Sequence, residues 1–223
     1  MTFNLCKWLT YRIDPGFEQR KEALVKVARC TCFIGARYDD DDFESGTAFF
    51  VGPTTLLTAG HVVRDQKTAV VAQLPGILTA VIDVKHLFTE TPTVETFRCQ
   101  VVLDKPVCFV DITILDCSQS NFRATEWLEL DRPVLKQSVK VDLIGYPGAY
   151  STQYVVDTQN VGPLGKSEVR DIEELLPSCE LTITHGPVIR GGKIPAYRVS
   201  TIGGMSGSPV VIDGKAVGTA QSK

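Results

Sequence analysis

Residues Gly46–Val63 read GTAFFVGPTTLLTAGHVV, and this stretch contains the pattern that decides the fold. It holds two short apolar runs, GTAFFV and TTLLTAG, with turn residues between them. Short runs rich in Val, Ile, Thr and Phe are typical of β-strands. His61 follows the small residues Ala59 and Gly60, so its ring can stand clear of the core with both nitrogens accessible. The stretch therefore predicts two strands that lead into an accessible histidine.

Runs of the same kind continue through the rest of the chain and form two sets. The first set begins near Val25 and also contains TAVVAQL (68–74), ILTAVIDVKHLF (77–88), FRCQVVL (97–103) and VDITILD (110–116). The second set contains SVKVDLIGY (138–146), TQYVVDT (152–158), CELTIT (179–184), AYRVST (196–201), SPVVI (208–212) and KAVGTA (215–220). Two sets of about six strands each, with a polar connection between them, predict an all-β double barrel.

The domain organisation follows from these two sets. We expect an N-terminal extension over 1–24, a first barrel over 25–117, an interdomain connection over 118–138 and a second barrel over 139–223. Near the first boundary, Glu18–Val27 has the spacing of a short amphipathic helix or of the lead-in to a strand, and Val25–Ile34 is expected to be a strand.

A helical insertion is expected within the second barrel. Ser167–Leu176 has helix-like spacing and is followed by Pro177, which is a stop signal. The simpler interpretation is a surface decoration, and the alternative is a loop that regulates the site or controls access of the substrate.

The composition places the chain among globular proteins and excludes several classes. Its 223 residues are 43% apolar and 22% charged, close to the globular average. A net charge of −3 argues against a dedicated nucleic-acid binder. The apolar runs are far shorter than the roughly 20 residues that span a bilayer, and Met1–Gly16 lacks the apolar core of a secretory signal. We therefore expect a cytoplasmic or otherwise intracellular protein that binds neither nucleic acid nor membrane.

The seven cysteines form no recognisable disulfide or metal pattern. Cys30 and Cys32 make a C-x-C pair, which differs from the C-x-x-C of zinc and redox sites. On a strand both would point to one face, so the simpler interpretation is a pair of small core side chains. The segment GARYDDDDFESG (35–46), with Asp39–Asp42 in a row, is interpreted as a solvated acidic loop, because it lacks the spacing and the glycine of a calcium loop. No metal ion or cofactor is expected.

Three segments contain the residue types that acyl transfer by a serine requires. His61 ends the TAGH segment, Asp111 lies at the start of the VDITIL strand, and Ser206 lies between glycines in GGMSGSP. A serine hydroxyl needs a base to take its proton, and that base needs a third group to hold its tautomer. His61, Asp111 and Ser206 have the chemistry for these roles. The amides of Gly204 and Ser206 are candidate donors for an oxyanion hole.

Each of these residues has rivals in the sequence. His86 and His185 lie on strand-like segments and are interpreted as structural. Asp104 precedes a Lys-Pro pair and is typical of a turn, whereas Asp116 ends its strand. Ser208 precedes a proline, which restricts the turn that would expose its hydroxyl.

Four motifs together resemble those of the trypsin-like (chymotrypsin-fold) serine proteases. They are GTAFFVGPTTLLTAGHVV, VDITIL (110–115), LIGYPG (143–148) and GGMSGSPVV (203–211), and they extend over most of the chain. In style they are nearest to the glutamyl endopeptidase and HtrA-like branches. The order His, Asp, Ser matches the chymotrypsin arrangement among the common serine hydrolases.

The resemblance implies two perpendicular six-stranded β-barrels with the active site in the cleft between them. It assigns the general base to His61, the orienting acid to Asp111, the nucleophile to Ser206 and an oxyanion donor to Gly204. The implied activity is hydrolysis of a polypeptide substrate through an acyl-enzyme, without a metal or a cofactor.

The sequence also departs from the digestive enzymes of this family. Met205 stands where they place the aspartate that pairs with a new N-terminus, and Val62 replaces the disulfide-forming cysteine of secreted relatives. Both departures agree with an intracellular enzyme that is controlled in another way. A pocket lined by Ser200, in place of the acid of trypsin-type enzymes, and Ala220, in place of the histidine of glutamate-specific relatives, implies small or medium apolar side chains at the cleaved residue.

Alternative functions remain open from the sequence. The chain ends at Lys223, about where the pocket wall begins in the family, so we expect a truncated barrel and a possible further domain. The runner-up function is a catalytically silent protease-like module for binding or scaffolding within a larger signalling protein. A viral or host-defence protease that cuts one specific protein would differ only in its substrate.

Overall fold

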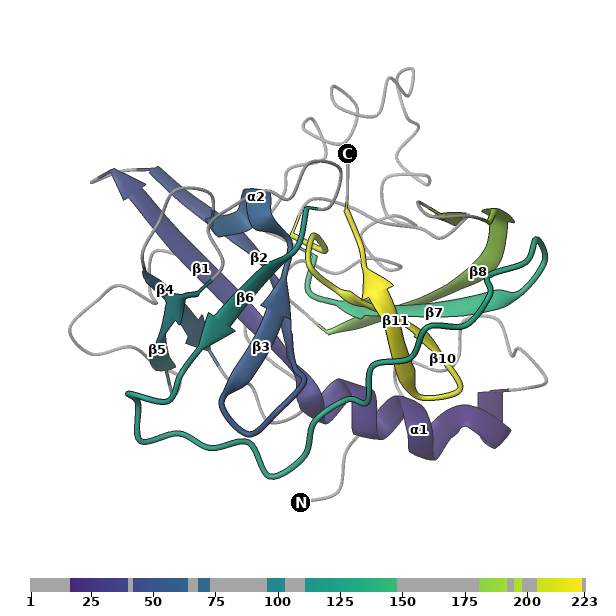
Figure 1. The fold of residues 1–223 in the computed structure, drawn as a ribbon, viewed down its shortest axis with the longest axis horizontal. Helices are drawn as coiled ribbons and strands as arrows, with labels where there is room; N and C mark the ends of the chain where they lie inside the picture. Colours follow the sequence, from purple (N-terminus) through teal and green to yellow (C-terminus); the bar gives the residue numbers. More distant parts are fainter. Residues whose placement is uncertain are drawn as a thin grey trace, which may run out of the picture.

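The described part of the chain is mostly β, as predicted, with two strand systems that lie side by side (Figure 1). Helix α1 (Phe17–Cys30) runs below the second strand system in this view and ends at the lower end of β1. The computed structural model describes residues 17–39, 42–63, 68–72, 96–102, 111–147, 181–191, 195–197 and 204–221.

The first strand system is a closed barrel in the order β1-β2-β3-β6-β5-β4, with antiparallel neighbours. Its strands are β1 (Thr31–Asp39), β2 (Asp42–Phe50), β3 (Thr55–Thr58), β4 (Thr68–Ala72), β5 (Thr96–Val101) and β6 (Thr113–Asp116). Alternate residues of these strands fill the interior, because side chains on a strand point to opposite faces in turn. Ile34, Phe50, Leu56, Phe97 and Leu115 are members of this core. The loop predicted over 35–46 is wrong for most of its length, because β1 continues to Asp39, β2 begins at Asp42, and the two strands pair as far as these residues.

The second strand system is a five-stranded sheet in the order β11-β10-β7-β8-β9. Its strands are β7 (Lys140–Gly145), β8 (Thr182–Arg190), β9 (Ala196–Tyr197), β10 (Pro209–Ile212) and β11 (Lys215–Thr219). The described residues thus supply five strands where six were predicted, and this five-stranded sheet is named the second barrel from here on. The predicted strand Thr152–Thr158 and the predicted helix Ser167–Leu176 lie outside the described residues.

The start of the first barrel differs from the prediction. The strand expected from Val25 is wrong, because helix α1 continues to Cys30 and β1 begins only at Thr31. Leu24 and Val27 lie on one helical face and enter a core cluster that also contains Phe49. Burial of this face between the barrels outweighs the small helical penalty of β-branched valines.

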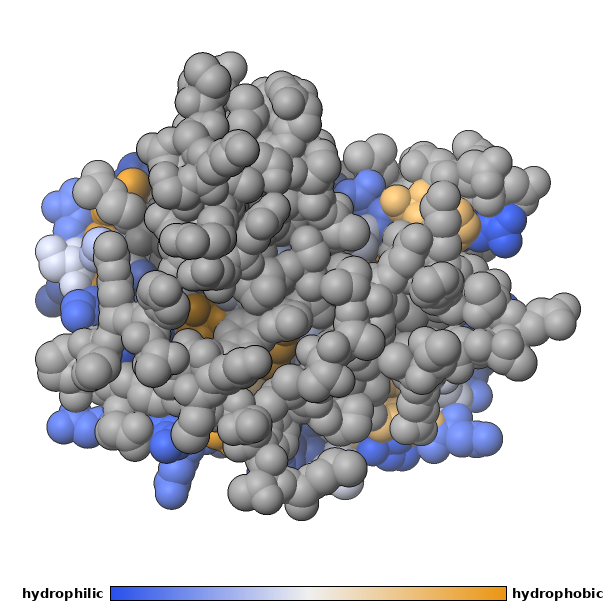
Figure 2. Space-filling model, turned by 180° about the vertical axis from the view of Figure 1, so that it is seen from behind, coloured by the Kyte–Doolittle hydropathy of each residue, from blue (hydrophilic) through white to orange (hydrophobic). Residues whose placement is uncertain are grey.

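Helix α1 contacts both barrels through this buried face. The cluster around Leu24 and Val27 combines Phe49 of β2 with Ile144 of β7 and Val211 of β10. The opposite face of the helix is polar, and hydrophilic side chains gather along the lower edge of Figure 2, where α1 lies. The helix therefore packs against both barrels through one apolar face.

Cys30 and Cys32 are both buried, but not for the predicted reason. Cys30 ends helix α1 and packs between the barrels, whereas Cys32 lies on β1 and packs inside the first barrel. Burial raises the pKa of the Cys30 thiol to about 11 and that of Cys32 further still. Both thiols therefore stay neutral at ordinary pH, as expected of core side chains.

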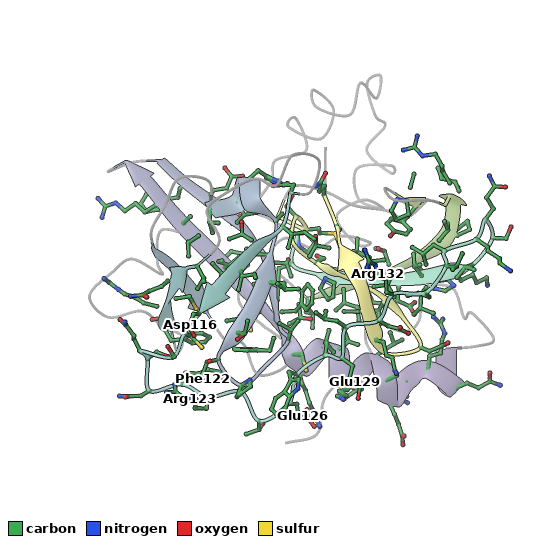
Figure 3. All side chains as sticks on the ribbon, viewed as in Figure 1. Asp116, Phe122, Arg123, Glu126, Glu129 and Arg132 are labelled. Carbon is green, nitrogen blue, oxygen red and sulfur yellow. The ribbon has the colours of Figure 1, made fainter. Side chains whose placement is uncertain are left out.

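The segment between β6 and β7 crosses both barrels without regular secondary structure apart from one isolated bridge (Figure 3). Phe122 stacks on Phe97 of the first barrel with ring centroids 4.5 Å apart. Farther along, the Leu128 amide donates to the Phe50 carbonyl, and the Asp131 amide donates to the Ala216 carbonyl. These bonds attach the connection to the first barrel and then to the second.

Candidate active site

The three residues predicted for acyl transfer come from three elements. His61 lies in the short helix α2 (Gly60–Val63), directly after β3. Asp111 lies just before β6, and Ser206 lies on the loop that leads into β10. The first two residues belong to the first barrel and the third to the second, so the site forms only where the barrels meet.

Strand pairing explains why His61 lies beside Asp111. Thr58 at the end of β3 pairs with Thr113 at the start of β6, so the residues just beyond these strand ends are neighbours. The Gly60 amide donates to the Asp111 main-chain carbonyl at 3.2 Å. A Cβ at Gly60 would lie 2.7 Å from Asp111 Oδ1, so this close approach requires glycine.

The Asp111 carboxylate holds His61 through two groups. One oxygen accepts the His61 main-chain N–H at 2.8 Å, and the other is hydrogen-bonded to ring nitrogen Nδ1. A carboxylate only accepts hydrogen bonds, so Nδ1 carries the ring proton. The side chains of His61 and Asp111 are 35% and 30% exposed.

Nε2, the other ring nitrogen of His61, faces the hydroxyl of Ser206. The distance from Nε2 to Oγ is 2.8 Å. With the proton on Nδ1, Nε2 of the neutral ring has a free lone pair and accepts the hydroxyl proton. Ser206 is buried. Asp111, His61 and Ser206 therefore form one continuous line of hydrogen bonds.

The loop that carries Ser206 requires glycine on both sides. Gly204 and Gly207 have positive φ angles of 89° and 86°. A Cβ at Gly207 would lie 2.1 Å from the Thr47 carbonyl oxygen, a distance that no side chain allows. Gly204 and Ser206, the residues predicted to supply oxyanion donors, thus lie on a loop packed directly against β2.

Ala220, one of the two predicted pocket residues, adjoins this loop. Its amide donates to the Ser208 carbonyl at 2.8 Å, and its carbonyl accepts the Gly207 amide at 2.9 Å. Its side chain is 8% exposed and lies in the core cluster that contains Met205. Ser200, the other predicted pocket residue, lies outside the described residues.

The structure separates the rival residues from the site. Asp116 lies at the far end of β6, where hydrogen bonds from Ser118 hold its pKa below the usual value. Ser208 has a buried hydroxyl with no hydrogen-bond partner among the described residues. His86 and Asp104 lie outside the described residues.

His185, the remaining rival, belongs to a polar cluster that the sequence analysis missed. Its Nδ1 lies 2.7 Å from an Asp142 oxygen, and the Arg20 guanidinium contacts the same carboxylate at 2.7 Å. Asp142 is buried on β7. Asp142 is the one acidic residue in the otherwise mostly apolar strand KVDLIG. A buried carboxylate needs partners, so this residue was the sequence signal for the cluster.

No group of His, Cys, Asp and Glu side chains in the described part of the chain is arranged to hold a metal ion. No helix among these residues is long and apolar enough to cross a membrane.

Solved structures share the fold at low sequence identity. A serine endoprotease from Yersinia pestis aligns with a TM-score of 0.54 and 17% identity over 88% of this chain and 55% of its own. The active form of the Rv3671c protease from M. tuberculosis aligns with a TM-score of 0.56 and 17% identity, covering 92% of this chain and 75% of the other. Deg5 aligns with a TM-score of 0.56 and 15% identity, covering 91% of this chain and 84% of its own. The chain thus spans about half the length of the Yersinia pestis protein.

Sequence comparison identifies the family. No curated protein matches the sequence. The profile of the trypsin-like peptidase domain matches residues 46–218, which is most of the chain and includes His61, Asp111 and Ser206. This match shows that the chain belongs to the trypsin-like peptidase family.

Proposed function

We propose that this chain hydrolyses peptide bonds of a polypeptide substrate through an acyl-enzyme intermediate. His61 is the general base, Asp111 its orienting acid and Ser206 the nucleophile. The observation that carries the proposal is the hydrogen-bonded line from Asp111 through both ring nitrogens of His61 to the Ser206 hydroxyl. This order supplies the acid, the base and the nucleophile that serine acyl transfer needs.

The proton moves along this line in the first half of the reaction. Ser206 Oγ forms a bond to the substrate carbonyl carbon while its proton passes to His61 Nε2, 2.8 Å away. The Asp111 carboxylate stabilises the imidazolium that results. The amides of Gly204 and Ser206 donate to the oxyanion, and Nε2 then gives its proton to the leaving amine as the C–N bond breaks.

Water completes the cycle with the same groups. His61 Nε2 takes a proton from the attacking water, and the new tetrahedral intermediate releases the acid product as Ser206 Oγ recovers its proton. The chemistry requires no group besides this chain, the substrate and water.

The pocket is proposed to take small or medium apolar side chains at the cleaved residue. Ala220 adds no charge beside the Ser206 loop, and Ser200 replaces the acid that selects basic residues in trypsin-type enzymes. Profiling on a peptide library tests this preference, and dominant cleavage after Arg, Lys or Glu would overturn it.

A fluorophosphonate probe tests the proposed nucleophile without knowledge of the substrate. The wild-type chain is expected to gain a single adduct by intact mass, because Ser206 Oγ displaces fluoride from phosphorus as His61 takes its proton. Ser206→Ala is expected to gain none. Ser208→Ala is the matched control, since it removes a buried hydroxyl two residues away and should label like the wild type.

The same experiment separates the proposed activity from the scaffold alternative. A well-folded wild-type chain that gains no adduct would contradict the proposal and favour a silent module. Labelling that persists in Ser206→Ala would assign the nucleophile elsewhere.

A further inference from the structure

Thr47 connects the strand system of His61 to the loop of Ser206. It lies on β2 of the first barrel and is fully buried. We propose that Thr47 is a positioning residue, whose hydroxyl fixes the Gly204 carbonyl and with it the loop that carries the proposed oxyanion donors. The proposal rests on the proposed function, because it concerns the same acyl transfer.

Thr47 holds the Ser206 loop at two points. Its main-chain N–H donates to the Ser206 carbonyl at 2.8 Å. Its hydroxyl Oγ1 lies 3.1 Å from the Gly204 carbonyl oxygen. The carbonyls at both ends of the segment from Gly204 to Ser206 are therefore bound by one residue of the opposite barrel.

The direction of the hydroxyl proton follows from its partners. The Tyr146 amide lies 2.9 Å from Thr47 Oγ1 and can only donate, so Oγ1 accepts this bond. A threonine hydroxyl has a single proton, and the Gly204 carbonyl is a pure acceptor. Thr47 therefore donates to Gly204, at a buried position where solvent does not compete.

The Gly204 carbonyl needs such an anchor because glycine has little conformational preference of its own. Gly204 has φ of 89°, and glycine populates both signs of φ about equally. The direction of its carbonyl sets the plane of the peptide between Gly204 and Met205. That peptide lies between the two amides proposed to bind the oxyanion, so its rotation would displace them relative to each other.

Thr47 is itself fixed on the side of His61. The Thr58 hydroxyl donates to the Thr47 carbonyl at 2.8 Å, and Thr58 ends the strand that leads into His61. The Gly207 position packs against the same carbonyl so closely that no Cβ fits. A short chain of contacts thus runs from the histidine strand through Thr47 to the serine loop.

The test replaces the hydroxyl while keeping the shape of the side chain. Thr47→Val exchanges the hydroxyl for a methyl group, and Thr47→Ser retains the hydroxyl. Thr31→Val is the matched control, because Thr31 is also buried on a strand and its hydroxyl donates to the Val27 carbonyl, away from the loop. Hydrolysis of a p-nitrophenyl ester gives kcat and KM, the fluorophosphonate gives a labelling rate, and thermal unfolding gives Tm.

We expect Thr47→Val to lower kcat and the labelling rate by about tenfold to a hundredfold, as misplacement of catalytic groups does, with little change in KM. Thr47→Ser should recover most of the loss. Thr31→Val should lower Tm like Thr47→Val but keep the wild-type kcat. If Thr47→Val does not fold, Thr47→Ala and Thr47→Ser give the same comparison.

The outcomes distinguish this proposal from the proposed function. A wild-type chain that is not labelled overturns both. A labelled wild type with an equally fast Thr47→Val overturns only the role of Thr47. That role also fails if Thr47→Ser is as slow as Thr47→Val, or if Thr31→Val loses kcat to the same extent.

Discussion

Two histidine–aspartate pairs lie in the described part of the chain, and they differ in their third partner. In the first barrel, His61 binds Asp111 through Nδ1 and contacts the Ser206 hydroxyl through Nε2. In the second barrel, His185 binds Asp142 through Nδ1, and Arg20 of helix α1 contacts the same carboxylate. The ring nitrogen and the acid are of the same kind in both pairs.

The third partner decides what each pair can do. A serine hydroxyl brings a proton that can move, so the His61 pair has the chemistry of a base. A guanidinium stays charged and does not give up its proton, so Arg20 compensates the buried Asp142 and attaches helix α1 to the second barrel. The comparison teaches that a His–Asp pair alone does not indicate an active site.

Removing each histidine gives the largest expected difference between the two pairs. His61→Ala should lower kcat for a p-nitrophenyl ester by about 10⁵-fold or more, as loss of the base does in serine proteases. His185→Ala should keep kcat within about twofold, because it lies outside the proposed catalytic bonds. Steady-state kinetics check both variants. A comparable loss of kcat in the two would contradict the different roles assigned to His61 and His185.

Neutralising each aspartate tests the same comparison through different readouts. Asp111→Asn should lower kcat by about 10⁴-fold with little loss of stability, because the amide no longer fixes the tautomer of His61. Asp142→Asn should retain kcat but lower the free energy of unfolding by about 3 kcal/mol, because it breaks the ion pair with Arg20 in a mostly buried site.

Steady-state kinetics measure kcat for both aspartate variants, and urea unfolding measures their free energy of unfolding. Loss of activity without loss of stability in Asp142→Asn would assign that carboxylate to the catalytic machinery. Such a result would contradict the structural role inferred for the Arg20 cluster.

The smallest expected effect concerns the helix itself. Arg20→Met should lower the free energy of unfolding by about 2 kcal/mol, since it removes charge-assisted hydrogen bonds to a buried carboxylate. Arg29→Met on the same helix is the control, because Arg29 and Glu126 form a largely exposed pair at 3.9 Å that contributes less than about 1 kcal/mol. Equal urea midpoints for the two variants would show that the cluster does not anchor α1.

Local sequence patterns predicted the parts of the structure that depend on near neighbours. The strands β2, β3 and β6 follow from short apolar runs between turn residues. The GGMSGSP segment predicted a tight turn, and Gly204 and Gly207 indeed require positive φ there. Each of these features depends on residues that are close together in the sequence, so the sequence is sufficient to predict it.

Helix α1 extends into a stretch that local patterns predicted to be a strand. The run from Val25 to Ile34 is rich in residues that favour strands, yet the chain is helical as far as Cys30. Its buried face contacts Phe49, Ile144 and Val211, which come from distant parts of the sequence. Such a surface exists only when the two barrels have assembled. The burial energy that favours the helix therefore comes from residues distant in the sequence, and no short stretch of the chain reveals it.

The sequence by itself determined the mostly β class and the residue types that acyl transfer needs, because strand patterns and glycine turns are local. Only the tertiary structure decided that His61 meets Ser206 while His185 meets Arg20. It also showed Thr47 between Gly204 and Tyr146. These contacts join elements that are far apart in the sequence, and their geometry depends on how the two strand systems and helix α1 pack, which no short stretch of the chain encodes.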